Sequence, residues 1–227
     1  MNGRVVHLDA RGFTVGVDQS FGNCPQYIQR REREPAPARA GMETEAETGP
    51  VAEPLAGLDE EARGLLGRAA HLLRRELRRR RRGRDGDGNV DTEQARAKSA
   101  ATPPRAVDVS HRGGRPGFVH VDGDRLTIPD FAGNLHFNTL GNLVANPRAG
   151  LLFVDFESGD LLQLSGRTGI VTDARAVSAH PGAERLWWLD VEAAVRRRGA
   201  FGLRFALRDF SPKTLATGGW AGAPTRL

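Results

Sequence analysis

The stretch Asp130–Phe156, DFAGNLHFNTLGNLVANPRAGLLFVDF, decides how this chain is expected to fold. Its three asparagines and two glycines within 133–142 lie between two apolar runs that are predicted to be buried strands, the second of which is GLLFVDF. Between the runs, apolar residues at 137, 140, 143 and 144 recur at the period of a short helix over 135–145. Asn146–Pro147 ends this helix, because proline disfavours a helical conformation in the residue before it. The predicted centre of the fold is therefore a strand, a short helix and a strand.

The segments on both sides of this centre are predicted to be strands joined by tight turns. GFVHVDGDRLTI gives two strands around Asp122–Gly123, and LLQLSGRTGIV follows GLLFVDF after the turn ESGD. RLWWLDV is a further strand, Glu192–Arg198 a short helix closed by Gly199, and LRFALRDF a last strand. This order predicts a mainly β (α+β) fold, built as a small antiparallel barrel with short helices.

The first half of the chain divides by composition. Residues 4–17 are predicted to form a hairpin around DARG, in which Gly12 can adopt positive φ. Residues 32–57 have the composition of a disordered linker. Residues 58–84 predict an Arg-rich amphipathic helix, with Asp59 as N-cap and an apolar stripe at Leu65, Ala69, Leu72, Leu73 and Leu77. Residues 85–106 are predicted to be a flexible connector.

The positive charge of the chain is local. The formal net charge is +5, whereas Arg74–Arg84 alone carries +7, so the remainder is slightly acidic. The arginines within 74–84 could bind the phosphates of a nucleic-acid backbone, but no aromatic residues are interleaved with them for base stacking. A solvated helix end is the preferred interpretation, and a nucleic-acid partner is not expected.

Composition also restricts the other classes of site. Cys24 is the only cysteine, which excludes an internal disulfide and a cysteine-built metal centre, and it is expected to be buried and inert. No metal ligand set is predicted. No apolar run has the length of a membrane span, and the N-terminus lacks a secretory signal pattern, so a cytoplasmic protein is expected.

Polar residues cluster at the predicted helix over 135–145. They are Asn134, Asn138, Thr139 and Asn142. A helix start offers unpaired N–H groups and a positive dipole end that suit a phosphate, and Gly133 permits close approach of a ligand. The alternative is ordinary N-capping and a polar surface.

A second candidate lies in VSHRGGRPGF, Val109–Phe118. Arg112 and Arg115 flank two glycines, and such a loop can wrap an anion. The alternative is a solvated turn with charged flanks. His111 has no partner identifiable from the sequence.

These residues occur in a stretch with a recognisable resemblance. Residues 113–167, from GGRPGFVHVDGDRLTI through NLVANPRAGLLF to LSGR, resemble the pyridoxamine 5'-phosphate oxidase-like FMN-binding split barrels. The similarity is greatest to the bacterial flavin-nucleotide-binding proteins with tandem barrels. QSFGNCPQYIQRR resembles the end of the preceding barrel in those proteins, so residues 1–31 are expected to be a remnant of a first, N-terminally truncated barrel.

The resemblance implies that residues 107–227 form a split barrel that binds FMN between two protomers of a homodimer. By position, the phosphate and ribityl contacts would fall on Asn134, Asn138, Thr139 and Asn142, with Arg112 or Arg115 as the cation and Gln163 near the ring edge. Asn138 and Thr139 stand where the oxidases carry an Arg–Lys pair, and an Arg-rich helix stands where the family has an apolar strand. The implied activity is that of a flavin-dependent oxidoreductase of unknown substrate, with no catalytic residue assigned. A non-catalytic flavin carrier, or a degenerate barrel acting as an interaction or nucleic-acid-binding protein, remains the alternative.

Overall fold

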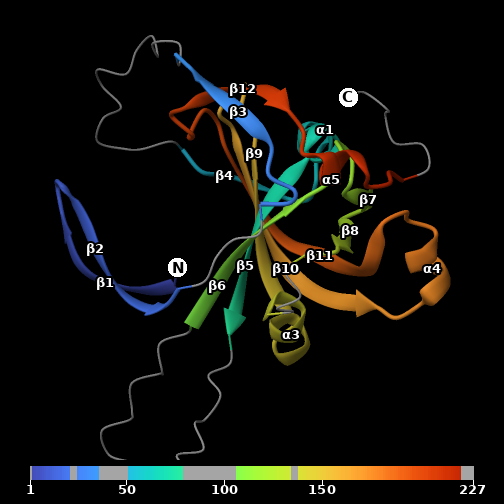
Figure 1. Cartoon of the computed structure of the whole chain (residues 1–227). Helices are drawn as coiled ribbons and strands as arrows, with labels where there is room; N and C mark the ends of the chain where they lie inside the picture. Colours follow the sequence, from blue (N-terminus) through green and yellow to red (C-terminus); the bar gives the residue numbers. More distant parts are fainter. Residues whose placement is uncertain (1, 21–24, 36–50, 79–105, 134–137, 221–227) are drawn as a thin grey trace, which may run out of the picture.

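The computed structural model describes residues 2–20, 25–35, 51–78, 106–133 and 138–220. Its strands are β1 (Asn2–Asp9), β2 (Gly12–Gln19), β3 (Arg30–Glu34), β4 (Glu53–Leu55), β5 (His71–Arg78), β6 (Ala106–Gly113), β7 (His120–Asp122), β8 (Arg125–Phe131), β9 (Arg148–Val154), β10 (Leu161–Val171), β11 (Ala183–Arg197) and β12 (Arg204–Asp209). Its described helices are α1 (Glu60–Arg68), α3 (Asn138–Ala145), α4 (Ala174–Ser178) and α5 (Pro212–Leu215). The arrangement is drawn in Figure 1.

The predicted mainly β fold with antiparallel strands and short helices is confirmed. The central eight-stranded sheet has the order β6-β5-β9-β10-β11-β8-β7, with β4 paired to β11 beside β8. Two smaller sheets are formed by β1 with β2 and by β12 with β3. The described strands do not close into a barrel through backbone pairing, because β6 and β7 lie at opposite ends of the sheet order.

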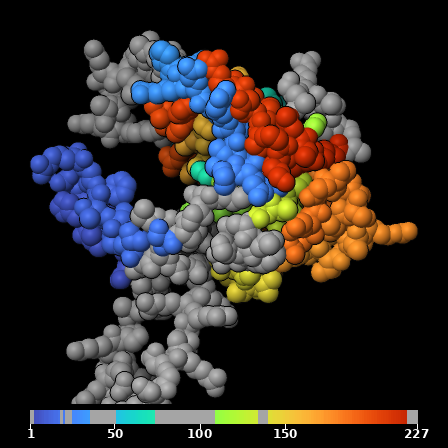
Figure 2. Space-filling model, viewed as in Figure 1, coloured from blue at the N-terminus to red at the C-terminus, as the bar shows by residue number. Residues whose placement is uncertain are grey.

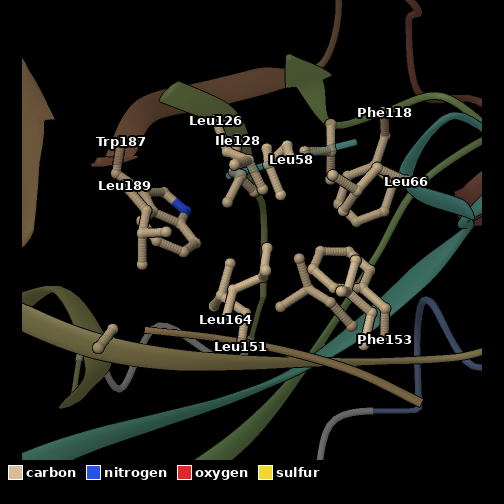
Figure 3. Packing of buried hydrophobic residues seen from close by; sticks show 14 of the residues in the cluster. Leu58, Leu66, Phe118, Leu126, Ile128, Leu151, Phe153, Leu164, Trp187 and Leu189 are labelled. Atoms are coloured by element: carbon tan, nitrogen blue, oxygen red, sulfur yellow. The ribbon is translucent and has the colours of Figure 1, made fainter. Parts of the chain in front are cut away.

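The hydrophobic core lies inside the curved main sheet. Figure 3 shows side chains of β8 and β11 pointing toward those of β9 and β10 across the interior. Leu66 of α1 and Phe118 pack at one side, and Leu140 and Leu143 of α3 are also buried in this cluster. β10 shows why the sequence folds this way, since its buried residues alternate with exposed ones along LLQLSGR.

Several local predictions are confirmed. β1 and β2 form the predicted hairpin, and Gly12 and Gly123 adopt positive φ at the two predicted turns. α3 covers the described part of the predicted central helix, and the Asn146 N–H closes its end by donating to the Asn142 carbonyl at 2.8 Å. Trp187 is buried while its neighbour Trp188 is half-buried on the other face of β11, as expected for a strand.

The prediction of one helix over 58–84 is wrong for residues 71–78, and residues 79–84 lie outside the described part of the chain. α1 begins after the N-cap Asp59, whose carboxylate accepts a hydrogen bond from the Ala62 N–H, but it ends at Arg68. Residues 71–78 form β5, which pairs with β6 on one side and β9 on the other. Leu72, Leu73 and Leu77 fit the period of a helix and also that of a strand. Residues 71–78 form a strand because their backbone pairs with β6 and with β9. The resembled family has an apolar strand at this position, where a helix was predicted for this chain. β5 fills the position of that strand.

Two further boundaries differ from the predictions. Glu192–Arg198 is not a short helix, because β11 continues through Arg197 and pairs there with β10 and β4. Within 32–57, the ends of the predicted linker are ordered, since β3 reaches Glu34 and β4 spans Glu53–Leu55. In each case a distant strand supplies the hydrogen bonds, which local composition does not reveal.

The hairpin of β1 and β2 has one apolar face that no described residue buries. Residues 13, 15 and 17 share a face of β2, and their register partners are Leu8, Val5 and Gly3. On this face Val5 is 60%, Leu8 74% and Phe13 68% exposed. The hairpin is blue in Figure 1 and Figure 2, to one side of the main sheet. A two-stranded hairpin is marginally stable alone, so this face needs a packing partner.

Candidate functional site

The predicted polar cluster falls only partly within the described residues. Asn134 lies outside them, and so do the side chains of Asn138 and Thr139, which begin α3. Asn142 is half-buried on the last turns of α3. This helix packs against β5 and β10, so its end lies beside the start of β9.

Arg112 lies at the gap between the two ends of the main sheet. It is on β6, where its register partner is the buried Leu72, and it therefore faces inward. Its Nε lies 3.4 Å from Oδ1 of Asp130, a buried residue of β8. Since β6 and β8 are not neighbours in the sheet, this ion pair joins the two ends of the sheet through side chains. Arg112 serves here as a structural cation.

The N-terminal segment covers the same gap. The Tyr27 hydroxyl donates to the Ala132 carbonyl at 2.9 Å, and its ring lies 5.7 Å from that of Phe131. A Cβ at Gly113 would lie 2.7 Å from the Tyr27 carbonyl oxygen, so glycine allows this approach. Tyr27 is thus packed against Gly113 at the end of β6 and against Phe131 and Ala132 at the end of β8.

Arg115 binds the chain's own backbone. Its Nε donates to the Leu215 carbonyl at 3.0 Å, at the end of α5, and its Nη2 donates to the same oxygen. Its backbone N–H donates to Oγ1 of Thr217 at 3.2 Å. Both predicted cations therefore have protein partners, and Arg112 lies on the face of the sheet opposite to Gln163.

Gln163 belongs to an outward-facing strip on β9 and β10. The exposed residues of β10 are Gln163, Ser165 and Arg167, and their register partners on β9 are Leu152, Gly150 and Arg148. We call these six residues the outer strip. Neighbouring positions along one face of a strand are about 6.7 Å apart, so the strip extends roughly 13 Å along β10. It runs from two arginines, past a serine and a glycine, to an amide beside a leucine.

At the arginine end of the outer strip, some arginines form ion pairs with described carboxylates and Arg167 does not. Arg148 pairs with Glu192 at 2.9 Å, and Arg125 binds Asp190 through two hydrogen bonds of 2.5 and 2.8 Å. The hydrogen bonds from Arg125 lower the pKa of Asp190. No ion pair contact joins Arg167 to another described residue, although it is the register partner of Arg148 on β9 and of Asp190 on β11, and it acts electrostatically on the Asp190 carboxylate. Arg167 is thus the cation of the strip that can bind an external anion.

The apolar end of the strip continues across the sheet. Leu152 is the register partner of Leu73 on β5, and Leu73 in turn of His111 on β6. On the other side, the Gln163 amide oxygen accepts a hydrogen bond from Arg197 Nε at 3.2 Å. This row thus runs from an oriented amide, over two leucines, to an imidazole.

Gln163 was predicted as a site residue from the resemblance, and the other five residues of the outer strip were not predicted. The alternation in LLQLSGR places 163, 165 and 167 on one face, and this signal was available in the sequence. The pairing of Arg167 with Arg148 depends on the register between β9 and β10, which the sequence does not state.

The described residues contain no group of three or more side chains placed to bind a metal ion. Within the same residues, no helix has the length and apolar character required to cross a membrane. A scan of protein-family models and a search of curated proteins find no match to this chain.

Proposed function

We propose that this chain binds FMN on the outer strip and acts as a flavin-binding protein of the split-barrel kind. One observation supports this most, the order of chemical groups along the strip. A cation, small polar groups, and then an amide beside leucines follow one another along β9 and β10. FMN presents a phosphate, a polyhydroxylated chain and a flat ring in the same order.

Each part of the strip suits one part of this ligand. The Arg167 guanidinium suits phosphate oxygens, because its fork of donors forms charge-assisted hydrogen bonds. Ser165 supplies a hydroxyl, and Gly150 adds no side chain above the sheet, so a ligand can approach the backbone. Leu152 and Leu73 provide an apolar surface for a ring, and Gln163 lies beside it to bind polar atoms at the ring edge.

A homodimer with the flavin at its interface is part of this proposal. A strip on an open sheet face covers only one side of a ligand, whereas binding sites bury most of the ligand surface. The chain has apolar surface to pair with a second copy. Leu73 and Val109 are exposed on the same face of the main sheet. The apolar face of the β1–β2 hairpin, a separate sheet, is exposed as well. A second protomer would cover these surfaces and complete the site.

Bound FMN would supply redox chemistry, and the protein would supply orientation and electrostatics. The residues of the outer strip bind and orient, and none is placed as an acid or base. The proposed activity is therefore that of a flavin-dependent oxidoreductase of unassigned substrate, or of a flavin carrier if no substrate reduces or oxidises the bound group. Residues 71–78 of the predicted Arg-rich helix form the strand β5, and the other arginines of that run lie outside the described residues.

The proposal is tested by replacing Arg167 with glutamate. FMN affinity is expected to fall about tenfold or more, because a charge-assisted contact of about 1.5 kcal/mol becomes repulsion. Riboflavin, which lacks the phosphate, is expected to bind wild type and variant with similar affinity. Quenching of flavin fluorescence on titration measures both.

Arg175→Glu is the matched control for this experiment. Arg175 is exposed on α4, and the same change of charge there is expected to leave FMN affinity unaltered. A protein that does not take up FMN overturns the proposal, and so does an Arg167→Glu variant with wild-type affinity. In the loaded protein, bleaching of the visible bands by a reduced nicotinamide would favour the oxidoreductase over the carrier.

A further inference from the structure

An aromatic cluster joins the main sheet to the small sheet of β3 and β12. Phe156, in the turn between β9 and β10, lies 5.9 Å from Phe201 and 5.7 Å from Phe205 by ring centroids. The Phe205 N–H donates to the Phe156 carbonyl, and the Arg31 guanidinium of β3 lies 4.3 Å from the centroid of the Phe156 ring. We call β3, β12 and the segment 201–203 the β3–β12 lobe. Phe156 joins this lobe to the main sheet.

A pair of histidines supports Phe156 from the side of the main sheet. The His71 ring of β5 stacks on Phe156 at 4.8 Å and on His111 of β6 at 6.1 Å. Both ring nitrogens of His71 are buried without a hydrogen-bond partner. Buried polar atoms are nearly always paired, so an imidazole with neither nitrogen bonded is an unusual feature that calls for a physical role.

The charges that act on His71 come from His111 and Arg31, and both oppose a positive charge on its ring. β3 contributes Arg31, whose Nε and Nη2 donate to Gln29, and β6 contributes His111, on which the inward-facing Arg112 acts in turn. The carboxylates of the adjoining turn, Asp155 and Glu157, act on Arg31, and Asp155 also pairs with Arg68 of α1 at 3.4 Å. On β12, the Arg204 Nη1 donates to the Phe201 carbonyl. A protonated His71 would therefore meet cations and aromatic rings.

We propose that His71 and His111 form an acid-sensitive latch, in which the neutral rings hold the β3–β12 lobe against the main sheet and protonation releases it. Release separates Phe156 from Phe201 and Phe205 and exposes these aromatic side chains. None of the latch residues belongs to the six residues of the outer strip, although His111 is the register partner of Leu73, and the tests below use the protein without added flavin.

The sign of the pH dependence follows from burial. Burial, with smaller contributions from His111 and Arg31, lowers the pKa of His71 from 6.5 to about 4. Burial also lowers the pKa of His111. The closed lobe thus holds fewer protons than the open one, so closure is complete above pH 6.5 and weakens as the pH falls toward 4. For His71 alone, the ratio of open to closed lobe is expected to rise roughly 30-fold between pH 7.5 and pH 5.

Hydrogen exchange of the full-length chain, read by mass spectrometry and corrected for the intrinsic pH dependence of exchange, tests the latch. Protection of β3 and β12 is expected to fall roughly 30-fold from pH 7.5 to pH 5, while β10 and β11 keep theirs. His71→Phe keeps an aromatic ring at the stack and removes the titrating group, so its lobe is expected to keep its protection at pH 5. His120→Gln, an exposed histidine of β7, is the control and is expected to behave as wild type.

A direct titration keeps the proposal testable if His71→Phe does not fold. The imidazole resonance of His71 in the wild-type protein, followed by NMR, is expected to remain that of the neutral ring at pH 5.5. Three results would overturn the latch. They are full protection of the lobe at pH 5, equal loss of protection in β10 and β11, and an ordinary titration of His71 near pH 6.5.

Discussion

Replacing Arg196 with alanine is expected to lower the free energy of unfolding by about 2 kcal/mol, because it removes charge-assisted hydrogen bonds. The Arg196 side chain is only 5% exposed and carries a permanent charge at an inward position of β11. Its Nη2 donates to both carboxylate oxygens of Asp59 at 2.5 and 2.7 Å, and its Nη1 lies 3.2 Å from Glu53 and 3.3 Å from Glu61. Alanine would leave three carboxylates together without their shared cation.

The same arginine connects three elements of the fold. Asp59 is the N-cap of α1, Glu61 lies in its first turn, and Glu53 lies on β4. The hydrogen bonds from Arg196 lower the pKa of Asp59, so this contribution to stability is present above the ordinary pKa of an aspartate and is lost in acid. Loss of Arg196 is therefore expected to loosen the attachment of α1 and β4 to β11.

Arg198→Ala is the matched comparison. Arg198 also pairs with Glu61, at 2.7 Å, but its side chain is 57% exposed. An exposed pair contributes roughly 0 to 1 kcal/mol, so this variant is expected to unfold nearly as wild type does. Urea denaturation followed by tryptophan fluorescence measures both, and equal effects of the two substitutions would contradict the structural argument.

Replacing Gly166 with alanine is the second change with a large expected effect. A Cβ at Gly166 would lie 1.8 Å from the Asp190 carbonyl oxygen, which belongs to the backbone of β11. The clash falls where the pairing of β10 with β11 is irregular, between Ser165 and Gly166. Neither strand can move without disturbing the core behind it, so a loss of about 3 kcal/mol is expected.

Gly150→Ala tests whether this loss comes from steric overlap. Gly150 lies on the neighbouring strand β9, and the nearest atom to an added Cβ is the Leu164 carbonyl oxygen at an ordinary 3.6 Å. Its expected effect on stability is within about 1 kcal/mol of zero. Thermal unfolding of the two variants side by side provides the measurement, and a stable Gly166→Ala protein would mean that the two strands are less closely paired.

Local patterns were sufficient where short-range chemistry determines the conformation. The turns at Gly12 and Gly123 require positive φ, Asn146–Pro147 ends α3, and the alternation in LLQLSGR marks the two faces of β10. Gln163 was predicted as a site residue from a resemblance, and the structure places it on an exposed face. Its role toward FMN remains a prediction.

Local patterns failed where two periods fit the same residues. Leu72, Leu73 and Leu77 fit a helix and a strand alike, and pairing with both β6 and β9 decides for the strand. Likewise, Ala194 and Arg196 are both buried on one face of β11. From the sequence alone, this segment was predicted to be a short helix. An arginine at an inward position gives no local sign that carboxylates from α1 and β4 will meet it.

The sequence by itself determined the mainly β character, the hairpins and the short central helix, because each depends on neighbouring residues and their backbone preferences. Only the tertiary structure decided that β5 is a strand with neighbours on both sides. It also decided that the ion pair of Arg112 with Asp130 joins the two ends of the sheet, and that His71 stacks on His111 and Phe156. These contacts link residues distant in the chain. Their energies come from backbone pairing and burial, which exist only once the sheet is assembled.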